Sequence, residues 1–593
     1  MISQSRTHYH QGPTGPWTAG QDPQRKLRFG IVPSRALVLD LQLDTSAAYR
    51  PSFVRLAFST FVSAGGVPKF NAPTLHRLLS AGYFPRELPP TFSTEAFAAF
   101  AVSSAAGWKK TTWTSCVSHN LARPGGMRRP LRIPNPISYT RLAEVLEQQW
   151  TDLRNFTWAT RLSATRPQVR KNSPRAVTPR YRYAEVPRLR ALRRRGKRYV
   201  LCTDINQFYP TIYTHAIPWA LHTKAACKAN LALGQKKLTL PGDSIDKAFQ
   251  TMNDGQTHGI PIGPDASLVA AEVLLAAVDA QLVKRCGNEF QGFRYVDDYE
   301  LGFATLKAAE QTLIELQGIL ADYELQLNPR KTGIHELPRH LDDSWAIELA
   351  QARLRGVANP ISQRTDVLSL FSRAFELASE QPEKSVLRYA VARVQSLVVT
   401  SQGWKTFQNC LLGAASADPA TLPVVLGSLF RVSEASGTVV SKYALAQTFE
   451  SIISTHAPQA HGSEVAWALW GALAWGVQLD GALGKVLGDM DDDIVALLAL
   501  EVSGRGLLPA GTLDTSRWQT AVSHADALKS EHWLLAYEAH LQGWLNVPAV
   551  AAHPVFKSLS DAKISFLDKT KNVPLFPSAA GPIPGGMLED FYA

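Results

Sequence analysis

Three aspartates in two short segments have the types and surroundings that phosphoryl-transfer chemistry requires. Asp204 follows an apolar, β-favouring run over residues 199–203, and Asp297 and Asp298 stand together between two further β-favouring arms. A carboxylate at the exit of a buried strand is costly unless something positive binds there. If the two segments lie side by side, their carboxylates surround a common point. Hard oxygen ligands of this kind suit Mg²⁺, and two such ions could clamp the attacking and leaving oxygens of an in-line phosphoryl displacement.

Local patterns predict the elements that present these acids. The segment over residues 293–303 predicts a β-hairpin with Asp297 and Asp298 at its turn. Tyr209 comes five residues after Asp204, and the proline that follows it ends the extended segment. A pair of acids at a turn is usually a solvated loop, so the interpretation depends on the segments that accompany it.

Two further segments complete the pattern. Residues 259–264 read GIPIGP, a tight apolar turn that leads into a segment of helical spacing over residues 267–283. Gly263 in this turn would let the backbone approach a flat partner closely, such as a templating base or an incoming nucleotide. After another predicted helix, residues 325–332 place Lys331 just beyond a bend fixed by a proline.

The charge of the chain is unevenly distributed. The net charge is +12, yet residues 345–593 hold 18 Lys and Arg against 23 Asp and Glu. Residues 154–198 hold fifteen basic residues and one acid, Glu185, with Tyr and Trp interleaved, which suits phosphate contacts and base stacking. We expect this segment to bind nucleic acid, with a solvated basic face as the alternative. The acidic run over residues 489–493 is expected to mark a helix start with solvated acids.

Composition excludes several classes of protein. A hydrophobic fraction of 45% excludes wholesale disorder, and five cysteines without a CxxC pair indicate neither a zinc site nor a disulfide framework. The sequence has no apolar run of about 18 residues, which argues against a membrane partner. The first thirty residues are polar and lack the apolar stretch of a signal peptide. We therefore expect a cytoplasmic protein.

The motifs form an ordered set. D-x-x-x-F-Y begins at Asp204, G-I-P-I-G-P at Gly259, Y-V-D-D ends at Asp298 and L-N-P-x-K-T ends at Thr332. In this order they resemble motifs A, B, C and D of reverse transcriptases. Residues 129–136 resemble the fingers motif that lies upstream of them in that family. Y-V-D-D in this company is a highly specific signal.

The resemblance implies a fold class and a domain organisation. It implies an α+β right-hand polymerase domain, with fingers and palm, over residues 36–340 and a motif core over residues 125–340. Residues 341–575 are rich in Ala, Leu, Val and Trp at helical spacing, and an all-α domain of HEAT-like helical repeats would explain them. Residues 1–35 are expected to be a flexible leader and residues 576–593 a loose tail.

The resemblance also implies roles for the acids and their neighbours. Asp204 and Asp297 would hold two Mg²⁺ ions, or Mn²⁺ in their place, with Asp298 completing the site and the carbonyl of Ile205 as a further ligand. The 3′-hydroxyl of a primer would attack the α-phosphate of a deoxynucleoside triphosphate (dNTP) there. Lys331 matches the lysine of motif D and would protonate or neutralise the pyrophosphate leaving group.

Other matching residues would bind the nucleotide. Tyr209 matches the aromatic steric gate, whose ring would stand where a ribose 2′-hydroxyl projects and so favour deoxynucleotides. Arg132 is a candidate for the triphosphate grip, and Pro261 and Gly263 would shape the floor of the pocket. Ile262 stands where template-copying relatives commonly carry Gln, which removes a polar contact near the template and nucleotide.

Some features are most similar to one branch of the superfamily, the abortive-infection and defence-associated bacterial enzymes. They are the I-P-N-P fingers motif, the GIPIG variant and the long helical extension. This resemblance implies antiphage defence and a homo-oligomer assembled through the helical region. It also implies either a non-coding RNA template or protein-primed, template-independent synthesis, for which Tyr592 in the tail is one conceivable primer.

Two alternatives stay open at this point. One keeps the fold as a nucleic-acid sensor or scaffold, in which polymerisation is incidental. The other is a maturase-like retroelement polymerase, against which the helical extension and the lack of a Cys/His nuclease cluster in the sequence both count. All three carboxylates are present, which favours an active polymerase.

Overall fold

The computed structural model describes residues 71–104, 108, 112–234 and 240–572 of the chain. All the elements named below belong to one unit, Phe70–Ala593. The expected leader over residues 1–35, the expected tail over residues 576–593 and Tyr592 lie outside the described residues.

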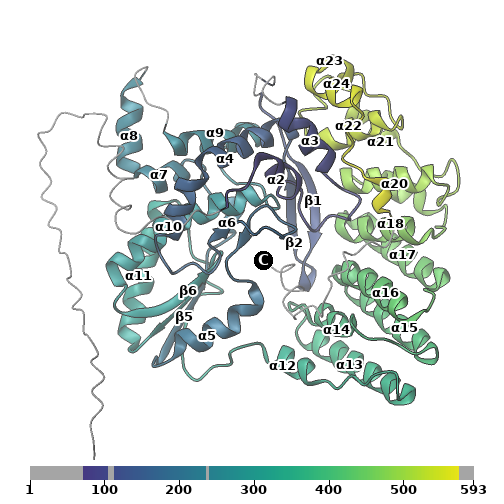
Figure 1. The fold of residues 1–593 in the computed structure, drawn as a ribbon, viewed down its shortest axis with the longest axis horizontal. Helices are drawn as coiled ribbons and strands as arrows, with labels where there is room; N and C mark the ends of the chain where they lie inside the picture. Colours follow the sequence, from purple (N-terminus) through teal and green to yellow (C-terminus); the bar gives the residue numbers. More distant parts are fainter. Residues whose placement is uncertain (1–70, 105–107, 109–111, 235–239, 573–593) are drawn as a thin grey trace, which may run out of the picture. The chain divides into compact units, whose positions relative to one another are not determined.

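A four-stranded antiparallel sheet carries both segments that hold the aspartates (Figure 1). Its strand order is β6-β7-β5-β8, so β5 lies between β7 and β8 although it comes first in the chain. Strands β6 and β7 form the predicted hairpin. The four strands are β5 (Tyr199–Asp204), β6 (Phe290–Tyr295), β7 (Asp298–Phe303) and β8 (Gly333–Glu336).

Helices cover the sheet and bury its apolar residues. α11 packs against β5, β7 and β8, and α10 packs against α4, α7 and α11. α10 is the helix predicted after the GIPIGP turn. Among the described residues it is the one helix long and apolar enough to cross a membrane, but 78% of its apolar window is buried inside the protein, as in a core helix. The helices of this part are α4 (Pro136–Trp158), α5 (Val186–Arg194), α7 (Ala216–His222), α8 (Lys224–Ala232), α9 (Pro241–Met252), α10 (Asp265–Cys286) and α11 (Leu306–Asp322).

A separate two-stranded hairpin precedes the sheet in the chain. β1 (Val117–Ala122) pairs antiparallel with β2 (Arg128–Ile133). The turn between them holds Gly125 and Gly126 at φ of 76° and 70°, a left-handed backbone that favours glycine. The segment that resembles the fingers motif therefore runs from β2 into the start of α4, where the Asn135 side chain caps the helix. Two short strands, β3 (Pro167–Gln168) and β4 (Thr178–Pro179), pair separately.

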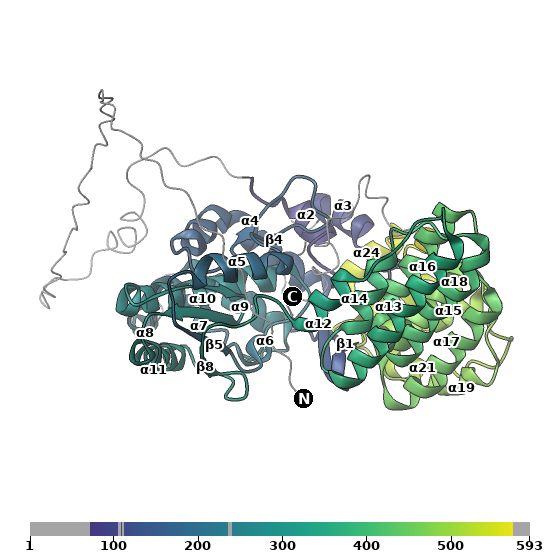
Figure 2. The same cartoon turned by 90° about the horizontal axis from the view of Figure 1, so that it is seen from below.

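The chain after the sheet is largely helical, which confirms that part of the prediction. Many of these helices pack against the next but one, as α13 does on α15, α15 on α17 and α16 on α18 (Figure 2). The finer assignment to HEAT-like repeats stays a prediction. The helices are α12 (Ser344–Gln351), α13 (Pro360–Glu380), α14 (Val386–Val394), α15 (Ser401–Ala417), α16 (Leu422–Ser436), α17 (Lys442–His456), α18 (Gly462–Trp475), α19 (Leu483–Gly488), α20 (Asp493–Gly504), α21 (Ser516–Val522), α22 (Trp533–Leu541), α23 (Ala549–Ala552) and α24 (Pro554–Asp561).

The helical region grips the β1–β2 hairpin. β1 packs against α18 and α20. The fully buried imidazole of His119 contacts both carboxylate oxygens of Asp492 at 3.1 and 2.9 Å. Arg128 donates to both carboxylate oxygens of Glu464 at 3.0 and 2.6 Å. The hairpin is therefore fixed to the helical region by an Arg–Glu ion pair and a His–Asp contact as well as by packing.

The acidic run over residues 489–493 does mark the start of α20, but two of its acids are buried and not solvated. The Asp492 side chain caps the helix by accepting from two backbone N–H groups. Asp493 is 2% exposed and accepts from the backbone N–H of Leu535 at 3.0 Å, with His532 Nδ1 at 2.9 Å. The expectation failed because α20 lies between the hairpin and α22, so that its N-terminus meets protein and not water.

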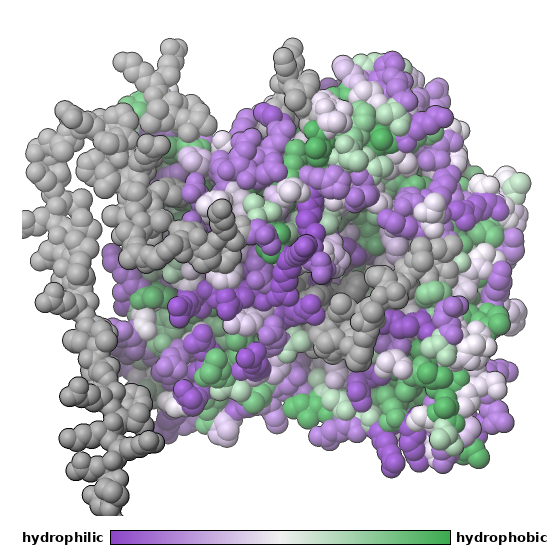
Figure 3. All heavy atoms as spheres, viewed as in Figure 1, coloured by the Kyte–Doolittle hydropathy of each residue, from purple (hydrophilic) through white to green (hydrophobic). Residues whose placement is uncertain are grey.

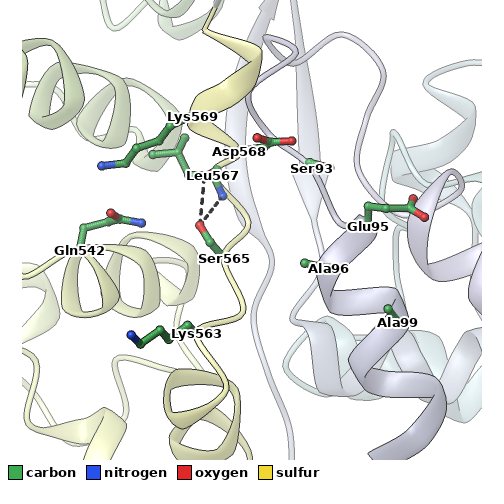
Figure 4. A pocket seen from close by; sticks show the side chains of 10 residues that line it. All are labelled: Ser93, Glu95, Ala96, Ala99, Gln542, Lys563, Ser565, Leu567, Asp568 and Lys569. Atoms are coloured by element: carbon green, nitrogen blue, oxygen red, sulfur yellow. Dashed lines mark hydrogen bonds between the residues drawn. The ribbon is translucent and has the colours of Figure 1, made fainter.

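The last described segment returns to the N-terminal helices α2 (Leu75–Ser80) and α3 (Glu95–Ser104). Phe92 and Leu567 form an antiparallel bridge, and the ring of Phe566 lies 5.3 Å from that of Phe97. A pocket of about 700 Å³ opens between α3 and this segment (Figure 4). None of its ten lining residues belongs to the aspartate cluster, so it is not the predicted site.

Candidate active site

The three aspartates meet at one end of the sheet. Strand pairing sets Asp204, the last residue of β5, opposite Asp298, the first residue of β7. The hairpin turn consists of Val296 and Asp297. The backbone N–H of Ile205 donates to the carbonyl oxygen of Asp297 at 3.3 Å, which ties the turn to the end of β5. The expectation that both neighbouring acids lie in the turn is thus corrected, because Asp298 belongs to the strand, where pairing holds it beside Asp204.

The carboxylates change one another's acidity. Burial, together with the charges of Asp298 and Asp204, raises the pKa of Asp297 to about 7. Burial and the charge of Asp204 raise the pKa of Asp298 to about 6, although its side chain keeps contact with solvent. Raised pKa values at Asp297 and Asp298 mean that the negative charge gathered here with Asp204 is costly, and a divalent cation would relieve that cost. The donors are all oxygen, which fits Mg²⁺ or Mn²⁺.

The segment after α11 lies along the end of β5 through an antiparallel bridge between Ile205 and Leu327. The backbone N–H of Asn328 donates to the carbonyl oxygen of Asp204 at 2.7 Å. Lys331 then reaches the carboxylate of the same aspartate, with Nζ 2.6 Å from Oδ2. The bridge uses backbone groups on either side of Ile205 and leaves the Ile205 carbonyl oxygen for another partner.

Lys331 is a cation held at the edge of the acidic cluster. Partial burial lowers its pKa, but the hydrogen bond to Asp204 and the charges of the three aspartates outweigh that effect and raise it overall. Its side chain is 62% exposed. A protonated amine at this place can neutralise negative charge that develops beside the carboxylates.

Tyr209 stands beside the carboxylates in the short helix α6 (Phe208–Thr211). Burial and the charge of Asp297 raise the pKa of its phenol well above the ordinary value. Its carbonyl oxygen accepts from the backbone N–H of Ile260 at 3.0 Å, which joins it to the GIPIGP turn. Phe208 is buried in the core and meets the Tyr209 ring edge-on at 5.5 Å.

The GIPIGP turn packs against Pro85, a residue from an earlier part of the chain. Gly263 has a φ of +131°, and a Cβ atom on it would lie 2.4 Å from Cγ of Pro85. The close approach that the structure shows at this glycine is to Pro85, and the expected approach of a templating base or nucleotide stays a prediction. Pro261 is buried beside it. Their predicted part in shaping the pocket floor stays a prediction.

Arg132 lies on β2 and makes contacts outside the aspartate cluster. Its backbone N–H donates to the carbonyl oxygen of Ile262 at 3.0 Å, and its guanidinium donates to Asn253 Oδ1 at 3.3 Å. Arg129 is three residues earlier on the same strand and therefore faces the opposite side. The role predicted for Arg132 in gripping the triphosphate stays a prediction.

Arg123 and Arg129 are the hairpin cations that interact with the site, and the sequence analysis did not single them out. Burial and the charge of Arg129 lower the pKa of Arg123, while the charges of the three aspartates act in the opposite direction. Arg129 in turn acts on the phenol of Tyr209. The available signal was a tight Pro-Gly-Gly turn flanked by arginines, immediately before the fingers motif.

A buried ion network lies behind the hairpin turn. Arg294 on β6 bonds the carboxylates of Glu272 and Asp279 on α10 at 2.8–3.1 Å. All three side chains are at most 1% exposed. The two acids are seven residues apart and so share one face of α10, which is the pattern that could have revealed them in the sequence.

The network is bonded directly to the turn that carries Asp297. Arg294 donates through Nη1 to the carbonyl oxygen of Val296 at 2.6 Å. The backbone N–H of Val296 donates to the hydroxyl of Thr165 at 3.0 Å, and that hydroxyl donates to Glu272 at 2.6 Å. Val296 has a φ of 52°, unusual for a β-branched residue. The network therefore holds a strained turn in the conformation that presents Asp297.

Many arginines of the basic segment over residues 154–198 contact other residues of the protein. Three of its arginines lie over the ring of Trp158, with guanidinium carbons 4.5–5.2 Å from the ring centroid, and five others form ion pairs. These are Arg154, Arg166 and Arg180 over the ring, and Arg175, Arg188, Arg190, Arg194 and Arg198 in ion pairs. Exposed cations of the segment include Arg161, Lys171 and Arg195. Figure 3 shows mostly hydrophilic residues on the face between the sheet and the β1–β2 hairpin.

Comparison with known proteins bears on this geometry. The family model of reverse transcriptase (RNA-dependent DNA polymerase) matches residues 131–357, the stretch that holds the three aspartates, Tyr209 and Lys331. None of the curated proteins compared matches the chain.

Among solved structures, the chain is similar to apo telomerase from Candida tropicalis, with 11% identity over 70% of this chain and 77% of that one and a TM-score of 0.30. It is also similar to telomerase from Candida albicans in complex with the TWJ fragment of telomeric RNA, with 12% identity over 63% and 70% and a TM-score of 0.27. At TM-scores this low, the likeness to these structures carries no argument about this chain. The match to the family model does carry one. Residues 131–357 form a reverse transcriptase domain, and the chain is an enzyme of the RNA-dependent DNA polymerase class.

Proposed function

We propose that the chain extends a primer 3′-hydroxyl with deoxynucleotides at the cluster of Asp204, Asp297 and Asp298. The observation that carries this proposal is the convergence of the three carboxylates, from β5, the hairpin turn and β7, inside a reverse transcriptase domain. These carboxylates, with the carbonyl of Ile205, would hold two Mg²⁺ ions. When bound, the ions would supply Lewis-acid activation and neutralise phosphate charge.

The chain's own residues would orient the nucleotide and neutralise the negative charge of its phosphates. Tyr209, held beside Asp297, would exclude a ribose 2′-hydroxyl by the bulk of its ring. Arg123 and Arg129 on the hairpin would face the triphosphate, since they are the hairpin cations whose charges interact with the site. Lys331 would leave Asp204 and donate a proton to, or pair with, the departing pyrophosphate.

Incorporation of labelled dNTPs by the purified chain tests this proposal. We expect Mg²⁺-dependent incorporation by the wild type and none by the Asp297→Ala/Asp298→Ala double variant. Treatment of the product with RNase and with proteinase then separates the modes of synthesis. A product shifted by proteinase indicates protein priming, and one that depends on co-purified RNA indicates a bound template. Equal incorporation by the double variant and the wild type would overturn the assignment of the site.

We further propose that this polymerase acts in the cytoplasm in antiphage defence, an inference that rests on the motif resemblance. Phage plating on cells that express the wild type or the double variant distinguishes this from a scaffold role. A polymerase should lose protection with its carboxylates, whereas a nucleic-acid sensor or scaffold should keep it. A maturase-like retroelement polymerase would give no protection with either protein.

The same resemblance supports two proposals about partners. Nucleic acid, including a non-coding RNA, would contact the exposed cations of residues 154–198, and copies of the chain would assemble through the helical region. Binding that weakens with salt and with charge reversal at Arg161 or Lys171 would support the first. A mass measurement in solution decides the second.

A further inference from the structure

The turn between α17 and α18 brings two imidazoles and a carboxylate together. His456 ends α17, His461 stands at the N-cap of α18, and Glu464 lies in the first turn of α18. The two Nδ1 atoms are 2.9 Å apart, and Oε1 of Glu464 lies 3.9 Å from the first and 3.8 Å from the second. These three side chains are not part of the aspartate cluster.

The spacing of these three atoms allows one metal ion to contact all of them from a point in their common plane. A single point lies about 2.1 Å from all three, which is the usual length of zinc bonds to imidazole nitrogen and carboxylate oxygen.

The carboxylate is already oriented by its surroundings. Arg128 bonds both oxygens of Glu464, and the Ser463 hydroxyl donates to Oε2 at 3.1 Å. Outer hydrogen bonds of this kind fix the ligating carboxylates of metal sites. The guanidinium also repels a cation, so the site would select a metal with strong affinity for imidazole over Mg²⁺.

We propose that His456, His461 and Glu464 bind one Zn²⁺ ion, with solvent in the fourth position. The two-nitrogen, one-oxygen donor set separates this site from the all-oxygen cluster of the three aspartates. Glu464 is also the partner of Arg128 on β2. The ion would therefore stabilise the contact between α18 and the β1–β2 hairpin. Counting cysteines in the sequence could not reveal this site, because none of its three ligands is a cysteine.

Cobalt titration of tag-free protein tests the proposal without reference to polymerase activity. The protein is stripped with a chelator and titrated with Co²⁺ in the Asp297→Ala/Asp298→Ala background, so that the aspartates do not contribute. We expect one equivalent to bind with visible d–d absorption and to be displaced by Zn²⁺. His456→Ala and His461→Ala should weaken Co²⁺ binding at least tenfold, while His524→Ala, at an exposed histidine, should not change it.

Two results would overturn the proposal. One is the lack of a Co²⁺ spectrum in folded parent protein, which would mean that the two imidazoles only share a proton between their Nδ1 atoms. The other is unchanged binding in the His456→Ala/His461→Ala double variant. If the histidine variants fail to fold, the melting temperature of the wild type decides. The proposal requires that it fall on chelation and recover with Zn²⁺, and an unchanged value refutes it.

Discussion

At the scale of single residues, the acidity of Asp297 and Asp298 links metal binding to pH. Both must be ionised to hold a divalent cation, and their pKa values are raised to about 7 and about 6. Protons therefore compete with the metal as the pH falls through that window. We expect the Mg²⁺ concentration for half-maximal incorporation to rise roughly tenfold or more per pH unit as the pH falls below about 6.5. Mg²⁺ titrations at several pH values measure this, and a requirement that stays constant would contradict the geometry of the cluster.

Arg294 is expected to position Asp297 without touching the substrate. Arg294→Lys keeps one charge among Glu272 and Asp279 but loses the bond to the Val296 carbonyl. We expect incorporation to fall at least about tenfold and the Mg²⁺ requirement to rise, because the turn is no longer held. Arg294→Gln should instead destabilise the fold by about 3–5 kcal/mol, since it leaves two buried acids unpaired.

A purely structural role for Arg294 would give a different result. In that case the lysine variant would lose thermal stability and keep the Mg²⁺ dependence of the wild type. Measurement of the melting temperature beside the Mg²⁺ titration separates the two.

Sequence reasoning singled out the residues that would hold the metal and missed the residues that position them. Asp204, Asp297 and Lys331 could be recognised because each stands at a fixed place in a short motif. Arg123 and Glu272 were missed, because the sequence signals at these positions are weak and their importance comes from contacts with residues far away in the chain. No sequence pattern indicated the contact between Gly263 and Pro85, since Pro85 lies outside any motif.

At the scale of elements, the β1–β2 hairpin joins the site to the helical region. The charges of Arg123 and Arg129 interact with groups of the site, while Arg128 holds Glu464 on α18. We expect Arg128→Ala to raise the KM for dNTP about threefold to tenfold with a smaller effect on kcat, because the hairpin loses its anchor. Arg505→Ala is the matched control, since it removes an ion pair to buried Glu501 within α20 and does not touch the hairpin. Equal effects of the two substitutions would show that the anchor does not matter for nucleotide binding.

Local pattern predicted the β6–β7 hairpin and α10, because both are set by neighbours in the sequence. It did not place β5 between β7 and β8, since that order depends on pairing between distant segments. It also treated the helical region as a separate domain. The pairs His119 with Asp492 and Arg128 with Glu464 join residues more than three hundred positions apart, and no local pattern indicates them.

At the scale of the whole described unit, the last segment closes the fold onto its first helices. The ring of Phe566 is fully buried among Phe84, Phe97 and Trp533. We expect Phe566→Ala to cost about 3–5 kcal/mol of stability, because the cavity spans elements from both ends of the unit. Tyr443→Ala, at a tyrosine that is 73% exposed, is the control and should change stability by less than about 0.5 kcal/mol. Thermal unfolding measures both, and similar melting temperatures for the two variants would contradict this closure.

The rate of dNTP incorporation by an Asp204→Asn variant tests the central claim most directly. The claim is that β5 and the β6–β7 hairpin present one catalytic site, and Asp204 is the β5 member. Asparagine keeps the shape of the side chain and removes its charge. We predict a loss on the order of a thousandfold, as complete as that from Asp297→Asn, with an unchanged melting temperature. A folded variant that incorporates dNTPs at nearly the wild-type rate would contradict the account.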